Sequence, residues 1–421
     1  MQSIFRRTGR RLTGAIVALT AAVILAPPLG AQEQEADPGA SSPGAGWVIG
    51  IGETGLGIGH VLRLNGVRIN WADRELDRIN GLNLTAWRPD DRVGGNVRGA
   101  AIGLVPTSGT LTGIGLGLAG VVGEERLSGV HVGGLATISG GAMRGVSAGA
   151  LATVGGELVQ GASLGGLAVV SAQRVEGAAL GGLAVLSGGD IRGVALGGLA
   201  VVSDEGMQGA QLSAGATISA GPMRGAQLGG LAVVADAGVH GFQGGGLAVV
   251  SDGTMRGAQA GGLAVVASDA MQGIQVGGLA VVSGESMRGV QAGGLGVIAG
   301  SSLQGVQLSG LATIASGPMS GLQASAIKVE SSSRITGLSF AGYQIRSPQV
   351  SGISGAVGWI DARELRGISV AGFNRSGLTV GVSAGLLNWT DELRGIQVGL
   401  LNRAGNNRPP FRVLPLVNAH L

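Results

Sequence analysis

The chain has 421 residues, of which 85 are glycine, 12 are proline and none is cysteine, and its formal net charge is +3. Hydrophobic residues make up 45% and charged residues 13%, so the chain is too apolar and too weakly charged to be disordered. It also lacks the proline-rich Gly-X-Y period of collagen. The absence of cysteine excludes disulfides, thiolate metal sites and cysteine nucleophiles.

The first 31 residues have the order of a secretory signal peptide. A basic front precedes an apolar run, Ala15–Ala26, and Leu29-Gly30-Ala31 supplies small residues before an expected cleavage site. The apolar run is shorter than the ~20 residues that a transmembrane helix needs, so we expect export rather than anchoring. There is no cysteine to carry an N-terminal lipid anchor. The basic residues of the front are Arg6, Arg7, Arg10 and Arg11.

Two segments separate this leader from a repeat array. Residues 32–46 are polar and rich in proline, glycine and serine, which predicts a flexible linker. Residues 47–110 contain Trp47, Trp71 and Trp87, which are absent from the uniform repeats that follow. Because repeat arrays need atypical ends, we expect residues 47–110 to form an N-terminal β cap.

An unbroken 16-residue repeat dominates residues 111–337. One anchor glycine marks each unit, and we number repeat positions from this glycine as position 0, as in GAQLGGLAVVADAGVH from Gly225 to His240. Positions 6 and 7 are almost always Leu-Ala, positions 9 and 14 are always aliphatic or methionine, and positions 4 and 5 are Gly, Ser or Ala. All charges between Gly129 and Ser320 lie at positions 11 to 15, so one end of each unit faces water.

The composition of the units predicts an all-β fold. Each unit holds three or more glycines, which are costly in helices, beside β-branched pairs such as Val233-Val234. The favoured architecture is a β-solenoid, in which each unit is one coil with strands near positions 14–19 and 6–10 and a tight corner at positions 4–5. In that arrangement we expect Leu231 and Leu263, at position 6, to be buried, and the corner glycines to need positive φ or close backbone approach.

A closed antiparallel β-barrel of the outer-membrane type is the alternative. The charge-free stretch of each unit matches the 9–11 residues of a membrane strand. Against the barrel, the turns show no 32-residue period, and Phe242 is the one aromatic residue between Gly129 and Ser320, where a barrel would carry aromatic girdles.

The C-terminal segment, residues 338–421, departs from the strict period and is expected to hold irregular β repeats and a cap. Its GIQVGLLN stretch, Gly395–Asn402, resembles the G-(L/V)-Q-(I/L/V)-G-L-(V/L/I)-N units of a bacterial surface repeat-containing protein family of unknown function. The central units match as G-(A/V/I)-Q-(L/A/V)-G-G-L-A and lack the asparagine of that family. This resemblance implies a location at the cell surface or outer membrane and implies no known reaction.

The residues available for chemistry do not form a recognisable site. His131 and His240 occupy different positions in distant units, so they do not build a zinc site. The carboxylates Asp73, Glu75 and Asp77 lie in a polar segment without an identifiable partner. The aspartates of the repeat turns drift in position and do not match a calcium β-roll. They are Asp204, Asp236, Asp252 and Asp269.

Position 2 holds glutamine in eight consecutive units. If the coils stack ~4.8 Å apart, as strands in a sheet do, the side-chain amides can bond to one another in a ladder. The glutamines are Gln211, Gln227, Gln243, Gln259, Gln275, Gln291, Gln307 and Gln323.

Together these features predict an exported, non-enzymatic structural or interaction protein of the bacterial cell surface. The alternative is an outer-membrane barrel that acts as a pore or an anchored platform. We expect no catalytic residue, cofactor or metal site. The expected partner is an unidentified surface or envelope component, with possible outer-membrane association. No cluster of lysine and arginine is present to suggest a nucleic acid.

Overall fold

The computed structural model describes residues 46–420, and every helix or strand element among them is a β-strand. The predicted signal peptide (1–31) and residues 32–45 of the predicted linker lie outside the described residues. Two compact units make up the chain, Met1–Gly221 and Pro222–Leu421, which we call the N-terminal and C-terminal units. Across residues 46–420 there is no helical segment that could span a bilayer.

The N-terminal unit starts with an antiparallel pair, β1 (Gly46–Ile51) and β2 (Thr54–Gly59). From β2 to β7 each strand pairs in parallel with the next one along the chain. These strands are β3 (Arg63–Asn70), β4 (Arg78–Thr85), β5 (Asn96–Gly103), β6 (Thr107–Gly117) and β7 (Gly120–Gly133). Parallel coils therefore begin well before the uniform repeats.

Beyond β7, each coil of the N-terminal unit contributes one short and one long strand. The short strands are β8 (Ala136–Ser139), β10 (Ala152–Gly155), β12 (Ala168–Ser171), β14 (Ala184–Ser187), β16 (Ala200–Ser203) and β18 (Ala216–Ser219). The long strands are β9 (Ala142–Gly149), β11 (Leu158–Gly165), β13 (Arg174–Gly181), β15 (Ile191–Gly197) and β17 (Met207–Ser213). Each strand pairs in parallel with its equivalent in the next coil.

The C-terminal unit repeats this plan. Its long strands are β19 (Met223–Gly229), β21 (Val239–Gly245), β23 (Met255–Gly261), β25 (Met271–Gly277), β27 (Met287–Gly293), β29 (Leu303–Ser309), β31 (Met319–Ser325) and β33 (Arg334–Ala341). Its short strands are β20 (Ala232–Ala235), β22 (Ala248–Ser251), β24 (Ala264–Ala267), β26 (Ala280–Ser283), β28 (Gly296–Ala299), β30 (Ala312–Ala315) and β32 (Lys328–Ser331). The coils continue within β34 (Gln344–Ala404), and β35 (Val413–His420) lies antiparallel on its end.

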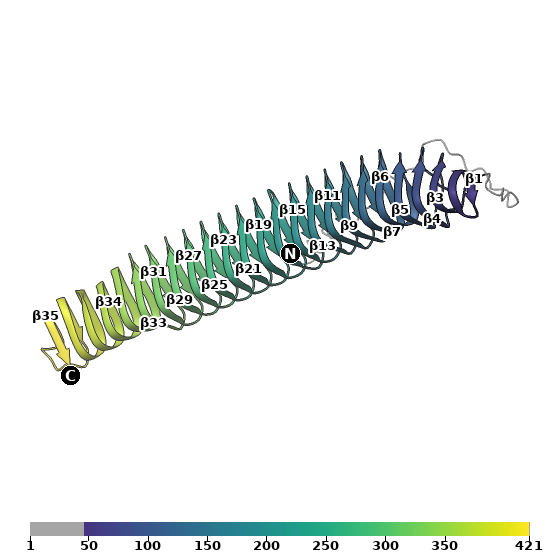
Figure 1. Ribbon diagram of the computed structural model, residues 1–421. Helices are drawn as coiled ribbons and strands as arrows, with labels where there is room; N and C mark the ends of the chain where they lie inside the picture. The colour runs from purple at the N-terminus through teal and green to yellow at the C-terminus, as the bar shows by residue number, and fades with distance from the viewer. Residues whose placement is uncertain (1–45, 421) are drawn as a thin grey trace, which may run out of the picture. The chain divides into compact units, whose positions relative to one another are not determined.

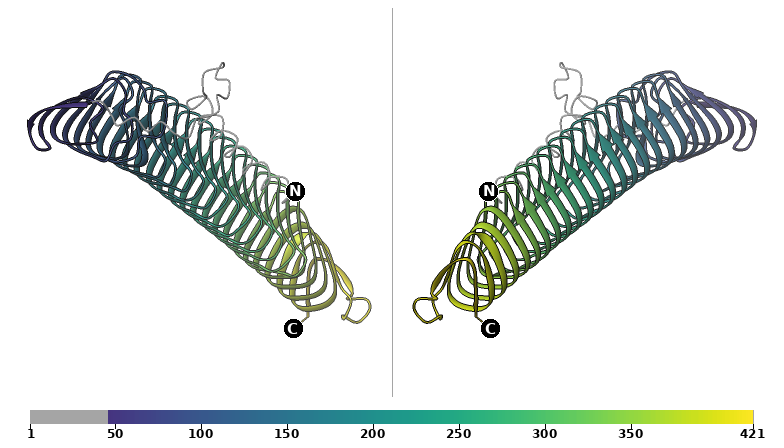
Figure 2. Two further views of the ribbon diagram at one scale, coloured as in Figure 1. Left: turned by 90° about the vertical axis from the view of Figure 1, so that its right-hand side faces the viewer. Right: turned by 90° about the vertical axis from the view of Figure 1, so that its left-hand side faces the viewer.

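The strand pairing identifies the fold as a β-solenoid. Equivalent residues of neighbouring coils pair in parallel, sixteen residues apart, as Met271 does with Met287 and Val265 with Val281. Figure 1 shows the resulting rows of arrows, and the turned views in Figure 2 show each coil as a flattened loop lying on the next. A closed antiparallel barrel needs neighbouring strands that alternate in direction, so the barrel alternative is wrong for these residues.

Side chains at positions 14, 2, 8 and 10 fill the interior between the two strands of each coil, and position 4 faces the interior with a glycine or another small residue. Met271 at position 14 and Val281 at position 8, for example, are fully buried. The leucines at position 6 are not: Leu231 is 55% exposed and Leu263 is 46% exposed. The expectation that these two leucines are buried is therefore wrong, because position 6 lies in the turn between the strands and faces outward.

The anchor glycines explain why the period is unbroken. In the uniform array they have φ between +103° and +127°, a region that residues with a side chain rarely adopt. A Cβ on Gly257 would also collide with the carbonyl oxygen of Gly241 in the preceding coil. Only glycine satisfies both conditions, so each coil must place one at position 0.

The corner at positions 4 and 5 depends on close approach instead of positive φ. A Cβ on Gly245 would collide with the carbonyl oxygen of Ala248, and one on Gly246 with that of Gly230, yet neither glycine has positive φ. Serine occupies position 4 in three coils, as Ser213, Ser309 and Ser325, so the corner accepts a small side chain.

Candidate functional site

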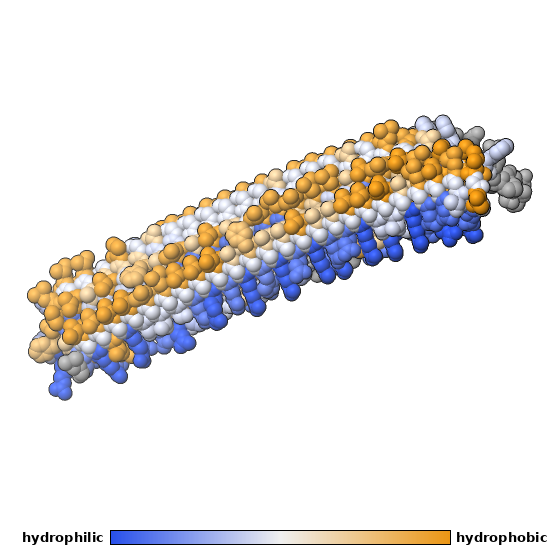
Figure 3. All heavy atoms as spheres, in the orientation of Figure 1, coloured by the Kyte–Doolittle hydropathy of each residue, from blue (hydrophilic) through white to orange (hydrophobic). Residues whose placement is uncertain are grey.

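The outer surface of the coils is mainly apolar. Outward side chains stand at positions 1 and 3 on the long-strand face, at position 6 in the turn, and at positions 7 and 9 on the short-strand face. In neighbouring coils of the C-terminal unit, Val276 at position 3 and Leu279 at position 6 are each 45% exposed, and Ile298 at position 9 is 41% exposed. On the side of the coils that Figure 3 shows, hydrophobic residues form orange rows that run from coil to coil.

We call this surface the apolar wedge and define it by the outward positions 1, 3, 6, 7 and 9 of the coils between Met223 and Ala326. The turn at positions 5 and 6 is its apex, and the long-strand and short-strand faces are its two sides. Because the two turns of a coil join opposite ends of the same two strands, the apex lies opposite the turn at positions 11 to 13.

Charged side chains occupy that opposite edge, which comprises the turn at positions 11 to 13 and the outward position 15 at the start of the next long strand. In the N-terminal unit Arg192 pairs with Asp190 there, with Nη2 and Oδ2 2.7 Å apart. In the C-terminal unit Arg288 donates from Nε to the side-chain oxygen of Gln304 at 3.0 Å. The edge appears as a blue border below the apolar rows in Figure 3. These exposed pairs contribute little to stability, so their main effect is to keep one edge in water.

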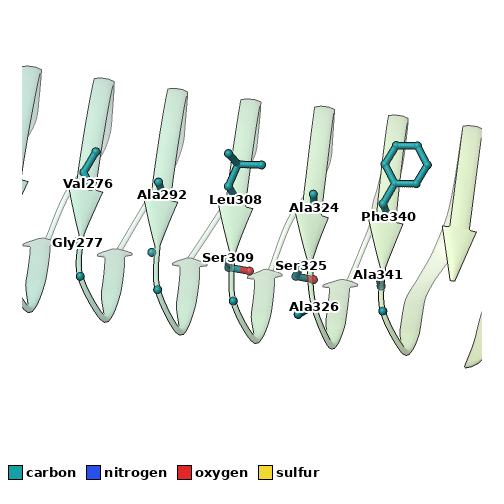
Figure 4. A pocket seen from close by; sticks show the side chains of 15 residues that line it. Val276, Gly277, Ala292, Leu308, Ser309, Ala324, Ser325, Ala326, Phe340 and Ala341 are labelled. Atoms are coloured by element: carbon teal, nitrogen blue, oxygen red, sulfur yellow. The ribbon is translucent and has the colours of Figure 1, made fainter. Parts of the chain in front are cut away.

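A shallow groove runs along one side of the wedge in the C-terminal unit. Positions 3, 4 and 5 of five successive coils line it, and it encloses about 710 Å³. Figure 4 shows Val276, Ala292, Leu308 and Phe340 in a row on neighbouring strands, with small residues beside them. The groove is open and carries no charged side chain, so the contact that it offers is mainly apolar.

The carboxylate of Asp73, for which the sequence identified no partner, is fully buried at the centre of a polar cluster. Its Oδ1 accepts hydrogen bonds from Arg68 (2.8 Å), Asn70 (2.9 Å) and Asn83 (2.9 Å). Its Oδ2 accepts from the hydroxyl of Thr85 (2.9 Å) and from the backbone N–H of Thr107 (3.1 Å). Arg68 is also fully buried, and burial lowers the pKa of its guanidinium while Asp73 opposes that shift. The ion pair is therefore part of the interior and not a reactive site.

The partners of Asp73 could have been found from the coil pattern. Arg68 and Asn83 stand two residues after the positive-φ glycines Gly66 and Gly81, which is the inward position 2 of the later repeats. The spacing between these two glycines departs from sixteen, so a search for a strict period passes over them. The other two carboxylates of that segment lie apart: Asp77 pairs with Arg63 at the surface, and Glu75 is exposed.

The predicted glutamine ladder is confirmed within the C-terminal unit. In each step Nε2 of one glutamine donates to Oε1 of the glutamine one coil before it, as from Gln243 to Gln227 (2.8 Å) and from Gln275 to Gln259 (2.8 Å). The ladder ends at Gln323, whose Oε1 has no partner because Ser339 occupies position 2 of the next coil. These side chains are buried, so the ladder stabilises the coil stack and is not available to a ligand.

Asparagine forms a second ladder near the C-terminus. Asn374 donates to Asn388 (2.8 Å) and Asn388 donates to Asn402 (2.7 Å), and all three side chains are buried. Asn402 is the asparagine of the GIQVGLLN stretch, and its Nδ2 donates to the backbone oxygen of Gly399. The position that carries the family resemblance therefore has an interior, structural contact.

The histidines lie apart from one another. His131 is fully buried at position 2, and desolvation lowers its pKa to about 4. Burial also lowers the pKa of His240, and the nearby Arg256 adds to the shift. Among residues 46–420 no cluster of three or more histidine, aspartate or glutamate side chains could hold a metal ion.

Comparisons with protein-family models, with curated proteins and with solved structures gave no match to this chain. The fold and the surface described above are therefore the basis for the function that follows.

Proposed function

We propose that this protein is exported and works as a non-enzymatic structural or interaction element at the surface of a bacterium. The observation that carries the proposal is the apolar exterior of the coils between Met223 and Ala326, where charged side chains are restricted to one edge. Such a surface acts by contact over a wide area. Two groups of polar side chains, around Asp73 and along the glutamine ladder, are buried, and hydrogen bonds between their members link neighbouring coils.

The predicted leader supports the location. Its basic front and short apolar run have the order of a signal peptide, and a chain without cysteine does not depend on the redox state of the compartment that receives it. The resemblance of Gly395–Asn402 to bacterial surface repeat proteins agrees with this location and adds no reaction.

Cell fractionation tests the proposal. The full chain, expressed in a diderm bacterium, should lose about thirty residues and appear in the envelope fraction or the medium. A leader variant with Ile16→Arg and Val23→Arg should stay unprocessed in the cytoplasm, because charges interrupt the apolar run. A wild-type chain that keeps its leader and remains cytoplasmic would contradict the proposal.

Surface exposure needs a separate measurement. Because the chain has no native cysteine, Gln272→Cys on the charged edge gives a single thiol. A membrane-impermeant maleimide should label this variant on intact cells. Labelling that requires lysis would show that the protein is exported without reaching the surface.

A further inference from the structure

We propose that the apolar wedge of the C-terminal unit inserts into the acyl region of a lipid surface, with its charged edge in water. This inference rests on the proposed function, because it names the partner class of the same surface. It follows from three properties of the wedge: which sides are apolar, how the apex backbone is bonded, and where charge is absent.

The first property is that apolar side chains cover three sides of each coil. Val276 projects from the long-strand face, Leu279 from the apex and Ile298 from the short-strand face, and each is more than two-fifths exposed. A second copy of the chain, or any other flat protein partner, would cover one of these sides and leave the other two in water. A layer of acyl chains covers the apex and both faces together, as it does for amphipathic elements that lie in a membrane interface.

The second property is that the N–H groups of the apex have partners within the solenoid. In the coil that contains Leu247, Gly246 donates to Gly229, and both Leu247 and Ala248 donate to Leu231. The same three bonds recur in the next coil, where Leu263 donates to Leu247. An unpaired N–H group costs several kcal/mol in hydrocarbon, so a turn can enter lipid only if its donors are bonded internally.

The third property is the distribution of charge. Between Pro222 and Ala326 no charged residue stands at positions 0 to 10. The charged edge of this stretch is close to neutral, since it holds three arginines and four carboxylates. The arginines are Arg224, Arg256 and Arg288, and the carboxylates are Asp236, Asp252, Asp269 and Glu285. Binding should therefore depend on apolar contact and should not require anionic lipid or low salt.

Single-cysteine labelling tests the insertion at each side. Full-length variants Val276→Cys, Leu279→Cys, Ile298→Cys and Gln272→Cys are labelled with an environment-sensitive fluorophore and mixed with phosphatidylcholine vesicles that contain a nitroxide-bearing phosphatidylcholine. The first three labels should shift to the blue and be quenched by the nitroxide. The label at Gln272, at position 15 where β25 begins beside the charged edge, should shift and be quenched least, because it lies farther from the apex than Val276 on the same strand. If Leu279→Cys fails to fold, Leu295→Cys reports on the apex in the next coil.

A matched pair of charge variants gives an independent measurement. Leu279→Asp with Leu311→Asp places two carboxylates on the apex, whereas Gln272→Asp with Gln304→Asp places the same two charges on the edge of the same coils. Vesicle flotation should show partition weakened about tenfold or more for the apex variant and unchanged for the edge variant, since burying a carboxylate in acyl chains is unfavourable.

The other outcomes overturn the inference. Quenching confined to one face, or a blue shift that grows with protein concentration in the absence of vesicles, identifies a flat partner such as a second copy. No quenching at any site, with vesicles bound only through the leader, excludes insertion of the coils. Both results leave the proposed surface function intact, because that function is tested separately by processing and by maleimide labelling of cells.

Discussion

Replacing one anchor glycine should destabilise the solenoid more than its small size suggests. Gly257 has a φ of +109°, and a Cβ there would meet three backbone atoms of Gly241 in the preceding coil, including its carbonyl oxygen. Holding alanine at such a φ costs ~1–3 kcal/mol. Moving the Gly241 carbonyl away from the added methyl group weakens a hydrogen bond between coils, which costs about 1 kcal/mol more. We therefore expect Gly257→Ala to lower the free energy of unfolding by ~2–4 kcal/mol.

Gly296→Ala is the matched control in the same unit. It stands at position 7, where nearly every other coil has alanine; its φ is not positive, and an added Cβ would lie 3.5 Å from the carbonyl oxygen of Ala312, an ordinary contact. Because alanine restricts the unfolded chain more than glycine does, we expect a gain of ~0.5 kcal/mol. Equilibrium unfolding in urea measures both changes. Equal midpoints for Gly257→Ala and wild type, or equal losses in the two variants, would refute the reasoning.

Three further perturbations test the interior and the outer surface. His131 has a pKa of about 4 in the folded chain and about 6.5 in the unfolded chain. Between these values the unfolded chain binds a proton that the folded chain does not, so the free energy of unfolding falls as the pH drops from ~6.5 towards 4. His131→Gln should remove ~3 kcal/mol of that pH dependence, measured as the difference in unfolding free energy between neutral pH and pH ~4. Asp73→Ala leaves Arg68 buried without its counter-ion and should cost ~3–5 kcal/mol by chemical denaturation; a loss below 1 kcal/mol would contradict the buried pair. Met255→Ala should cost ~2–5 kcal/mol because the side chain is fully buried, whereas Leu263→Ala should cost less than ~1 kcal/mol, and similar losses would contradict the outward placement of position 6.

The period and the strand content of the fold followed from the sequence, because a repeat that never slips must place equivalent residues in equivalent contacts. Side-chain placement in the turns did not follow. Leu231 was expected to be buried because leucine occupies position 6 in nearly every unit, but apolar side chains also make up much of the exposed surface of folded proteins. Alternation within the strands places positions 8 and 10 inward, while position 6 precedes the short strand and escapes that alternation.

Some of the buried polar contacts could be predicted from the sequence and others could not. The glutamine ladder could be predicted because Gln227 and its equivalents share one position in successive coils. For the cluster around Asp73, the coil pattern gives the inward positions of Arg68 and Asn83. It does not give Asp73 itself, which lies in a connection between β3 and β4 and reaches Thr107 across more than thirty residues. The apolar wedge required the structure, since the sequence shows which positions are apolar but not that they surround three sides of a coil.

The antiparallel strand β35 also determines what happens at the free end of the stack. Each coil pairs with the next through the backbone N–H and C=O groups along the edges of its strands. A coil whose strand edges are unpaired could therefore bind another copy of the chain and start a fibre. β35 covers the edge of the preceding strand from Gly395 to Arg403. Its own outer edge is interrupted by Pro415, which has no N–H to donate, and by Leu416, with a φ of +66°. Without β35 the edge of that strand would be uncovered, so we expect a variant that lacks β35 to polymerise through this edge more readily than the chain that carries it.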